Sequence, residues 1–179
     1  MIIGVQLRRI VLAIIAITPL ALSTIAHASG ASVFAAHCAV CHQSNGQGVQ
    51  GVYPALAGTM GKDVHSPAGR AYLVNVVSFG MSGAIVSQGA DYNGLMQPWP
   101  QLRDAEVAAV LNFILTRFNA KILPAGFKPY TAGEVKHLRA AHLTLDQVHT
   151  EREATLNPPS ANPIAPSANL IAPSAMKAH

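Results

Sequence analysis

The chain is short, mildly basic and poor in charged residues. It has 179 residues, of which 50% are apolar and 11% charged, with a formal net charge of +4, and this length suits about one domain. Its two cysteines are too few for a disulfide framework, and no long Lys/Arg run or stretch of 18 apolar residues occurs. These features argue against a dedicated nucleic-acid-binding protein and against a polytopic membrane protein.

Residues 1–28 have the three parts of a secretory signal peptide. Arg8 and Arg9 precede an apolar stretch from Ile10 to Leu22, and Ala26-His27-Ala28 forms a small-x-small cleavage site before Ser29. The alternative is an uncleaved membrane anchor, but the stretch is short for a span of about 20 residues. Cleavage would leave ten basic and eight acidic residues, a net charge of +2. We therefore expect a periplasmic protein that is not integral to the membrane once processed.

Residues 31–43 are predicted to form a short helix with Ser32 as its N-cap, because apolar residues recur there at helical spacing. The next segment, 44–69, is rich in glycine and proline. So long a loop inside a small domain suggests that something other than protein fills its centre.

Residues 70–79 predict a second helix, 80–103 a second glycine-rich loop, and 104–118 the clearest helix of the chain. In this last helix one apolar face recurs at the spacing of an amphipathic helix; it consists of Val107, Val110, Leu111, Ile114, Leu115 and Phe118. No segment between 29 and 120 alternates with period two, so the predicted fold is all-α.

The remainder of the chain is predicted to be an extension and a tail. In the extension, 121–156, Thr131 would cap one helix in a capping box with Glu134, and Thr144 would cap another over 143–153. Residues 157–179 consist largely of Pro, Ala, Ser and Asn and lack large apolar side chains, so we expect a disordered tail. The expected organisation is thus one domain over 29–120 followed by these two segments.

The sequence Cys38-Ala39-Val40-Cys41-His42 is the C-x-x-C-H motif of covalent haem attachment. On a helix Cys38 and Cys41 are i and i+3, so both sulfurs lie on one side and can form thioethers with the two vinyl groups of one haem. His42 can then bind the iron from below as the proximal ligand. The expected cofactor is one haem c.

Three other interpretations of the two cysteines fit the sequence less well. A thioredoxin-like motif requires a βαβ unit, and no such pattern is visible in the sequence. A structural zinc site requires about four ligands, and a second cysteine pair is missing. A simple disulfide between Cys38 and Cys41 would leave the long glycine-rich loops unexplained.

A haem held by one histidine has a second axial position, and Met96 is the candidate for it. It lies in the predicted loop before the long helix, and Pro98 and Pro100 stiffen the residues between Met96 and that helix. Met/His ligation raises the reduction potential and leaves no open position for a substrate. Met81 is the rival methionine, and His65 would instead give two histidine ligands.

These residues, in this order, resemble a class I c-type cytochrome over residues 31–118. The resemblance rests on Cys38 to His42, on Pro54-Ala55-Leu56-Ala57-Gly58, on Met96-Gln97-Pro98-Trp99 and on Leu102 to Ile114. It implies a few helices around one haem, with the first and last crossing.

The resemblance also implies specific contacts and two departures from the family. Phe34 and Phe113 would meet at the helix crossing, and the Pro54 carbonyl would accept a hydrogen bond from His42 Nδ1. Arg103 replaces the usual Ser or Thr cap, so that Asp104 would have to cap the helix, and Gln97 replaces the proline that commonly follows the ligand methionine.

The expected function is single-electron transfer by a monohaem carrier, or by the cytochrome subunit of a dehydrogenase or respiratory assembly, and the chain would not itself be an enzyme. Residues 121–156 resemble additions on cytochromes that partner periplasmic dehydrogenases, so redox proteins are the expected partners. The alternatives are a five-coordinate haem sensor or small-ligand enzyme, and a metal-binding protein that uses the histidines. The basic stretch from Arg117 to Arg139 could dock an acidic partner or form a solvated surface.

Overall fold

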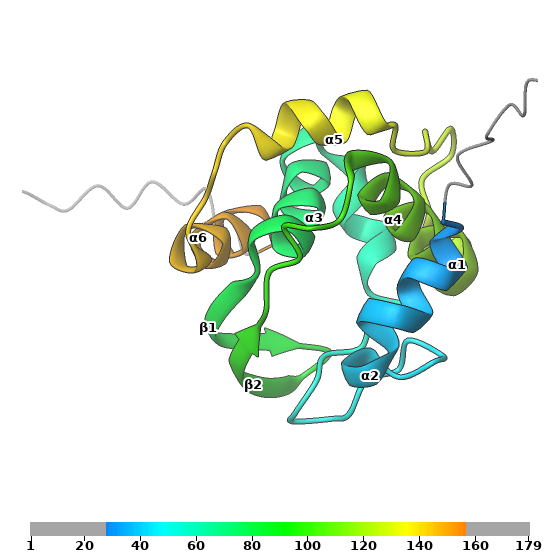
Figure 1. Cartoon of the computed structure of the whole chain (residues 1–179). Helices are drawn as coiled ribbons and strands as arrows, with labels where there is room; N and C mark the ends of the chain where they lie inside the picture. The colour runs from blue at the N-terminus through cyan, green and yellow to red at the C-terminus, as the bar shows by residue number, and fades with distance from the viewer. Residues whose placement is uncertain (1–27, 157–179) are drawn as a thin grey trace, which may run out of the picture.

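The computed structural model describes residues 28–156, so the predicted tail and all but the last residue of the predicted signal peptide lie outside the described part. Helices dominate this part, as predicted, and a small hairpin completes it (Figure 1). The elements are, in chain order, α1 Gly30–Val33, the π-helical η1 Phe34–Cys38, α2 Ala39–His42, the 3-10 helix η2 Met60–His65, α3 Pro67–Phe79, β1 Met81–Ser87, β2 Ala90–Met96, α4 Asp104–Phe118, η3 Ala120–Ile122, α5 Ala132–Arg139 and α6 Leu145–Leu156. Within the described range no helix is both long enough and apolar enough to cross a bilayer.

The first helical segment runs without interruption from Gly30 to His42 and confirms the helix predicted there. Its cap is Ser29 rather than Ser32, because the Ser29 hydroxyl accepts the Ser32 backbone N–H at 3.1 Å. The middle of the segment, η1, is wound as a π-helix, a local widening that is common next to functional sites. No spacing in the sequence had indicated it.

The first segment crosses α4, and aromatic rings and a glycine make the contact. The Phe34 ring lies 5.5 Å from Phe113 and 5.2 Å from Phe118, which confirms the expected meeting of Phe34 and Phe113. At Gly30 a Cβ would lie only 2.1 Å from the Ala109 carbonyl oxygen. The two backbones therefore approach as closely as they do because residue 30 has no side chain.

The core lies between α3 and α4. α3 starts at Pro67, three residues earlier than predicted, because the Ser66 hydroxyl accepts the Gly69 N–H at 3.0 Å and proline suits the first helical position. The side chains of both helices that face this core are excluded from solvent; the most buried are Leu73, Val74, Val107, Val110, Leu111 and Leu115. This burial supplies the main apolar stabilisation of the fold.

The prediction that 80–103 is a loop was wrong for residues 81–96. These residues form the antiparallel hairpin of β1 and β2, in register from Met81 opposite Met96 to Ser87 opposite Ala90. The turn uses Gln88 and Gly89, whose φ angles are 51° and 74°, as a two-residue hairpin turn requires. The strands contain Gly, Ala, Ser and Asn, which favour strands weakly, so packing against α6 rather than local propensity selects them.

The predicted C-terminal extension packs on the rest of the chain. α5 lies against α3 and α4, and α6 lies against α3 and β1, on the left of Figure 1. Val135 of α5 and Val148 of α6 are fully buried members of the same core cluster as the α3 and α4 side chains. Residues 130–156 therefore contribute to one continuous core.

The two predicted caps of the extension are present. Thr131 accepts the Glu134 N–H, but the Glu134 carboxylate pairs with the Arg70 guanidinium at 2.7 Å and does not complete the expected capping box. At α6 the Thr144 hydroxyl accepts the Gln147 N–H, and the Gln147 side chain accepts the Thr144 N–H, so the reciprocal box forms there.

Candidate functional site

Cys38 and Cys41 lie where the π-helical turn returns to α-helix. Cys38 is the last residue of η1, Cys41 is in α2, and both are free, partly buried thiols. Burial, and secondarily the neighbouring Cys41, raises the pKa of Cys38 to about 11. That thiol is therefore protonated at neutral pH, unlike the low-pKa thiolate of a Cys-x-x-Cys redox motif.

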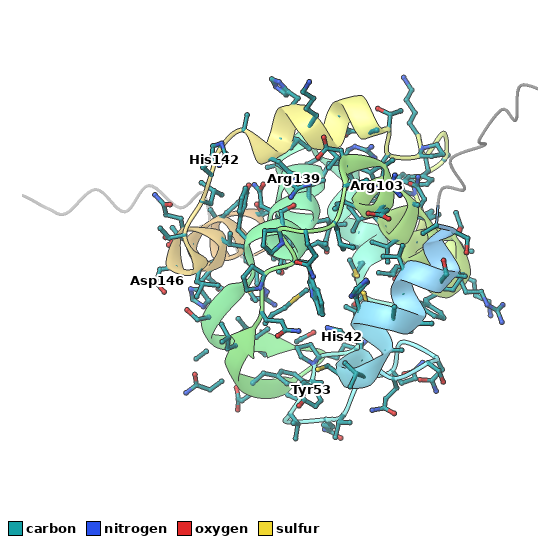
Figure 2. The ribbon with its side chains drawn as sticks, in the orientation of Figure 1. His42, Tyr53, Arg103, Arg139, His142 and Asp146 are labelled. Atoms are coloured by element: carbon teal, nitrogen blue, oxygen red, sulfur yellow. The ribbon has the colours of Figure 1, made fainter. Side chains whose placement is uncertain are left out.

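His42 ends α2 with a buried imidazole whose orientation is fixed (Figure 2). Its Nδ1 lies 2.8 Å from the Pro54 carbonyl oxygen. Since a carbonyl can only accept, Nδ1 carries the proton and Nε2 keeps its lone pair. Burial lowers the pKa of His42 although the bond to Pro54 acts in the opposite direction. The ring is thus the neutral tautomer that binds a metal through Nε2.

The loop after α2 brings Pro54 back to His42. The Gly48 N–H donates to the His42 carbonyl at 2.9 Å, and Val49 and Tyr53 pair across a tight turn. Gly48 has a φ of +64°, and a Cβ there would lie 2.2 Å from the Tyr53 carbonyl oxygen and 2.7 Å from that of Pro54. Position 48 of this loop therefore requires a glycine. Sequence reasoning had not singled out this residue.

Met96 is the last residue of β2 rather than part of a loop, which corrects its predicted setting. It lies directly opposite Met81, and paired residues of an antiparallel ladder point to the same face. Met81 is buried in the core, whereas Met96 is only partly buried against it. At Gly80, where φ is +72°, a Cβ would lie 2.4 Å from the Met96 carbonyl oxygen. The backbone at Met96 is thus closely fitted to the end of α3.

Three residues of α6 bind alternate residues of β1. Asp146 accepts the Ser82 hydroxyl at 3.0 Å, His149 Nε2 lies 2.8 Å from the Ala84 carbonyl, and the Arg152 guanidinium donates to the Val86 carbonyl at 2.8 Å. The three contacts thus join every second residue of β1 to every third residue of α6. α6 therefore fixes β1, the strand that pairs with β2, and Met96 is the last residue of β2.

Trp99 connects the segment after the hairpin to the first helical segment. Its backbone N–H donates to the Val77 carbonyl at 3.1 Å, and its ring meets the His37 ring edge-on at 4.7 Å between centroids. Trp99, three residues after Met96, thereby joins η1, which carries Cys38, to α3. Figure 1 shows α2 and the hairpin facing each other at the same end of the molecule.

The cap of α4 differs from the expected one. Arg103 is the N-cap residue, and its N–H is accepted by the Glu106 carboxylate at 2.9 Å. Asp104 does not cap the helix but pairs with Arg139, which also donates to the carbonyls of Leu102 and Pro100. Arg139 of the basic stretch is therefore used inside the molecule, whereas Arg117 and three lysines of that stretch are exposed.

The remaining candidate ligands do not gather into a site. His65, His137 and His142 are exposed. Among residues 28–156, no three His, Cys, Asp or Glu side chains are grouped so as to hold a metal ion.

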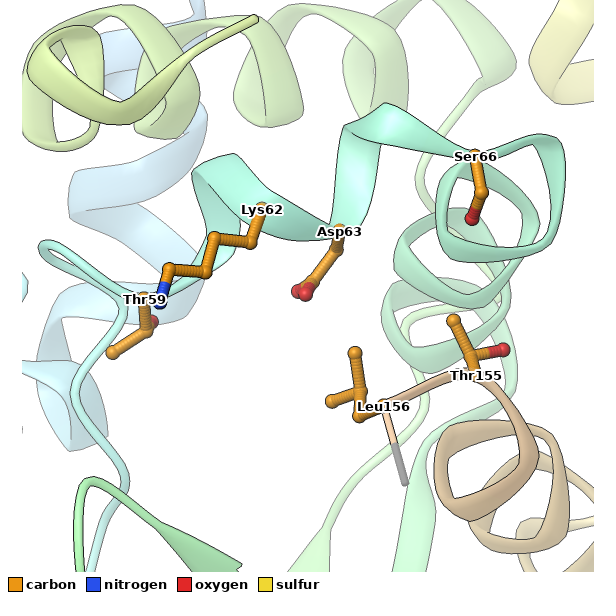
Figure 3. Close-up of a pocket in the computed structure, with 6 residues that line it drawn as sticks. All are labelled: Thr59, Lys62, Asp63, Ser66, Thr155 and Leu156. Atoms are coloured by element: carbon orange, nitrogen blue, oxygen red, sulfur yellow. The ribbon is translucent and has the colours of Figure 1, made fainter. Parts of the chain in front are cut away.

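A separate pocket of about 320 Å³ lies between η2 and the end of α6 (Figure 3). Asp63 lies in its wall, and burial raises the pKa of this carboxyl to about 6 against the opposing effect of Arg152. None of the predicted haem-binding residues lines the pocket, whose wall consists of Thr59, Lys62, Asp63, Ser66, Thr155 and Leu156.

The comparisons with known proteins agree with this geometry. Two proteins named cytochrome c-552, both from Thermus thermophilus, are 47% and 48% identical over 129 and 126 residues; the matches cover 72% and 70% of this chain and 86% and 95% of theirs. The cytochrome c subunit of a quinone alcohol dehydrogenase from Gluconobacter oxydans is 34% identical over 88 residues, 48% of this chain and 17% of that subunit.

The sequence pattern of the family described as cytochrome c matches residues 27–117, half of the chain. That span contains the cysteine pair, His42 and the hairpin. The chain belongs to the cytochrome c family and carries covalently attached haem c.

Proposed function

We propose that this chain is a single-electron carrier of the periplasm, exported by a cleaved signal peptide. In this proposal Cys38 and Cys41 would hold one haem through thioethers, and His42 Nε2 and the Met96 thioether would bind its iron. The chain passes electrons between redox proteins and catalyses no reaction of its own. The Gluconobacter relative is a dehydrogenase subunit by name, and this supports a dehydrogenase as one such partner.

The residues fit the cofactor by their donor chemistry. The observation that carries the proposal is the 2.8 Å contact between His42 Nδ1 and the Pro54 carbonyl. It commits one ring nitrogen to the protein and leaves the other for a metal, which is the usual outer-shell arrangement of a ligand histidine. The two neighbouring thiols are free and lie three residues apart, as attachment to one porphyrin requires.

Haem c supplies an iron that accepts and releases one electron. For this role the protein has to keep its own geometry unchanged in both oxidation states. Pro54 fixes the ring of His42, while the paired strands and α6 fix the backbone of Met96. With both the thioether and the imidazole bound to it, the iron would keep no open coordination position, which favours electron transfer over binding of a small ligand.

Met96 is preferred to Met81 as the iron ligand because its side chain is less buried in the core. Met81 is a buried core residue, and removing it into a ligand position would open a cavity. Met96 is partly buried at the end of β2. We therefore expect Met96→Ala to abolish the far-red Met–iron band of the oxidised protein, and Met81→Leu to retain it.

Mass spectrometry and a visible spectrum test the proposal. A polypeptide that begins at Ser29 and carries one haem, lost in the Cys38→Ala/Cys41→Ala variant, would support export and attachment. A high-spin spectrum that shifts with carbon monoxide or cyanide would instead favour the five-coordinate sensor or enzyme. A colourless product from a host able to attach haem would contradict the proposal altogether.

A further inference from the structure

His37 is an ionisable residue that the proposed function leaves unused. It directly precedes Cys38 in η1, where the Ala39 N–H donates to the Phe34 carbonyl five residues back. A turn of this π-helical kind takes up one more residue than an α-helical turn and occurs mostly at functional sites. The His37 side chain is partly buried, although residues 35 and 36 before it are exposed. His37 is therefore packed against another part of the chain.

The ring of His37 packs edge-on against the ring of Trp99. The centroids are 4.7 Å apart and the planes are inclined at 60°, which is a favourable arrangement for two aromatic rings. The Trp99 side chain is itself partly buried against the hydrophobic core. The contact therefore joins η1 to the segment that directly follows β2 and Met96.

Two backbone hydrogen bonds hold Trp99 from the other side. Its N–H donates to the Val77 carbonyl of α3 at 3.1 Å, and its carbonyl accepts the Leu102 N–H at 3.2 Å. These bonds fix the main chain on α3, whereas the His37 ring is the contact that holds the indole on η1.

The position of Trp99 is coupled to that of Met96 through a stiff connection. Gln97 and Pro98 separate the two residues. The ring of Pro98 fixes its own φ angle, and a residue before proline is restricted to extended conformations. A shift of Trp99 is therefore passed on to Met96 and is not absorbed between them.

Glu106 of α4 is the acidic group that lies near His37. Its pKa is lowered to about 2, first by the hydrogen bond from the Arg103 side chain, with His37 the weakest of the contributing groups. Arg103 already pairs with this carboxylate at 2.8 Å. The role of His37 therefore belongs to its ring and the contact with Trp99 rather than to its charge.

We propose that His37 is a positioning residue for Met96 and acts through Trp99. The ring pair holds the residues after Met96 against the segment that carries the cysteines, and so keeps the Met96 thioether at the place where it would bind the iron. This inference rests on the proposed function, because it takes Met96 as a ligand. His37 itself is not assigned as a ligand.

Free imidazole competes with Met96 for the oxidised iron, so its apparent affinity measures how firmly the Met96 thioether is held. The holoprotein is titrated with imidazole, and loss of the far-red band reports the displacement of Met96. The variants are His37→Ala, His37→Phe, Trp99→Leu and the double variant His37→Ala/Trp99→Leu. The matched control is His137→Ala, which removes an exposed imidazole from α5.

His37→Ala should bind imidazole about fivefold more tightly than the parent, because one aromatic contact is lost. His37→Phe keeps a ring and should stay within about twofold of the parent. In the Trp99→Leu background, His37→Ala should have no further effect, because the partner of His37 is already missing. The control His137→Ala should match the parent.

An unchanged imidazole affinity in His37→Ala, with a lower free energy of unfolding, would show that the ring pair only stabilises the fold and would overturn the proposal. Equal tightening in His37→Phe would assign the effect to the charge near Glu106 and would overturn it as well. Equal tightening in His137→Ala would have the same consequence.

These outcomes are separate from failure of the proposed function. A parent protein without a far-red band, or a band that persists in Met96→Ala, contradicts Met96 as a ligand. A parent protein with the expected band, together with the wrong pattern of imidazole affinities, contradicts only the role of His37.

Discussion

At the scale of single residues, glycines decide how closely the chain can approach its own functional groups. Gly48 lies against the carbonyl that orients His42, Gly80 against the backbone of Met96, and Gly30 against α4. The chemistry-bearing residues were recognisable from Cys38, Cys41 and His42 alone, because their spacing is local. The sequence could not predict which glycines are required for these close approaches, because the atoms that surround a glycine are known only once the chain is folded.

Gly48→Ala should loosen the hold on His42. The new Cβ meets the carbonyls of Tyr53 and Pro54, and alanine has to adopt the left-handed backbone conformation of Gly48. We therefore expect a loss of about 3 kcal/mol in the free energy of unfolding and a shifted NMR signal of the His42 ring. Gly51→Ala is the matched control, because its φ is +74° and a Cβ there meets nothing within 4 Å. It should cost only about 1 kcal/mol and leave the ring signal in place; equal effects would refute the argument.

Gly30→Ala tests the helix crossing against helix propensity. Propensity alone predicts that alanine stabilises a helix by about 1 kcal/mol, but a Cβ here meets the Ala109 carbonyl, so we expect destabilisation by about 2 kcal/mol. Gly133→Ala in α5 has only the Thr131 hydroxyl nearby, at 3.9 Å, and should be neutral or stabilising. Denaturant unfolding of both variants gives the comparison.

At the scale of elements, the hairpin and α6 form a packed unit that could not be predicted from the sequence. Neither strand alternates cleanly, and the Gly, Asn and Ser content of 82–94 is typical of a loop. The strands persist because each pairs with the other and because Asp146, His149 and Arg152 contact β1. The strong periodicity of α4 and the local cap at Thr131 were predictable, whereas contacts between residues over 60 positions apart were not.

Arg152→Met should disturb Met96 through β1. The buried Arg152 side chain donates to Val86 and pairs with Glu153 at 2.6 Å, so its loss should cost about 2 kcal/mol. If α6 positions the hairpin, the far-red band should weaken and the reduction potential fall, with Arg152→Lys recovering part of both. Ser82→Ala, which removes a more exposed bond, should lower stability by less than about 1 kcal/mol. An unchanged potential in Arg152→Met would show that α6 only adds stability.

At the scale of the whole molecule, buried charge and exposed apolar surface are separated. Asp63 lines the pocket between η2 and α6, and Arg152 of α6 is buried and acts on its carboxyl, whereas residues 38–61 and 80–102 carry Asp91 as their only Asp, Glu, Lys or Arg. Composition showed a near balance of acidic and basic residues. It could not show that the few charges avoid one end, because that depends on which loops the fold brings together.

Asp63 should make stability depend on pH. Burial raises the pKa of this carboxyl from 3.8 to about 6, so the native state binds the proton more tightly than the unfolded chain. The favourable contribution is complete below about pH 4 and is lost as the pH rises to about 6. Asp63→Asn should therefore flatten the pH dependence of the denaturation midpoint in this window, by about 1 kcal/mol for a partly exposed group. Asp91→Asn, on the exposed strand β2, serves as the control.

The three contacts between α6 and β1 have a consequence for proteolysis. After a cut in the exposed stretch around Ala141 and His142, only these contacts and its buried face would hold α6 on β1. If Met96 binds the iron as proposed, the reduction potential of the nicked molecule would change before its helices unfold, because Met96 lies on the strand paired with β1. Trimming of the C-terminal region would then tune the redox poise of the carrier while its colour and its haem stayed in place.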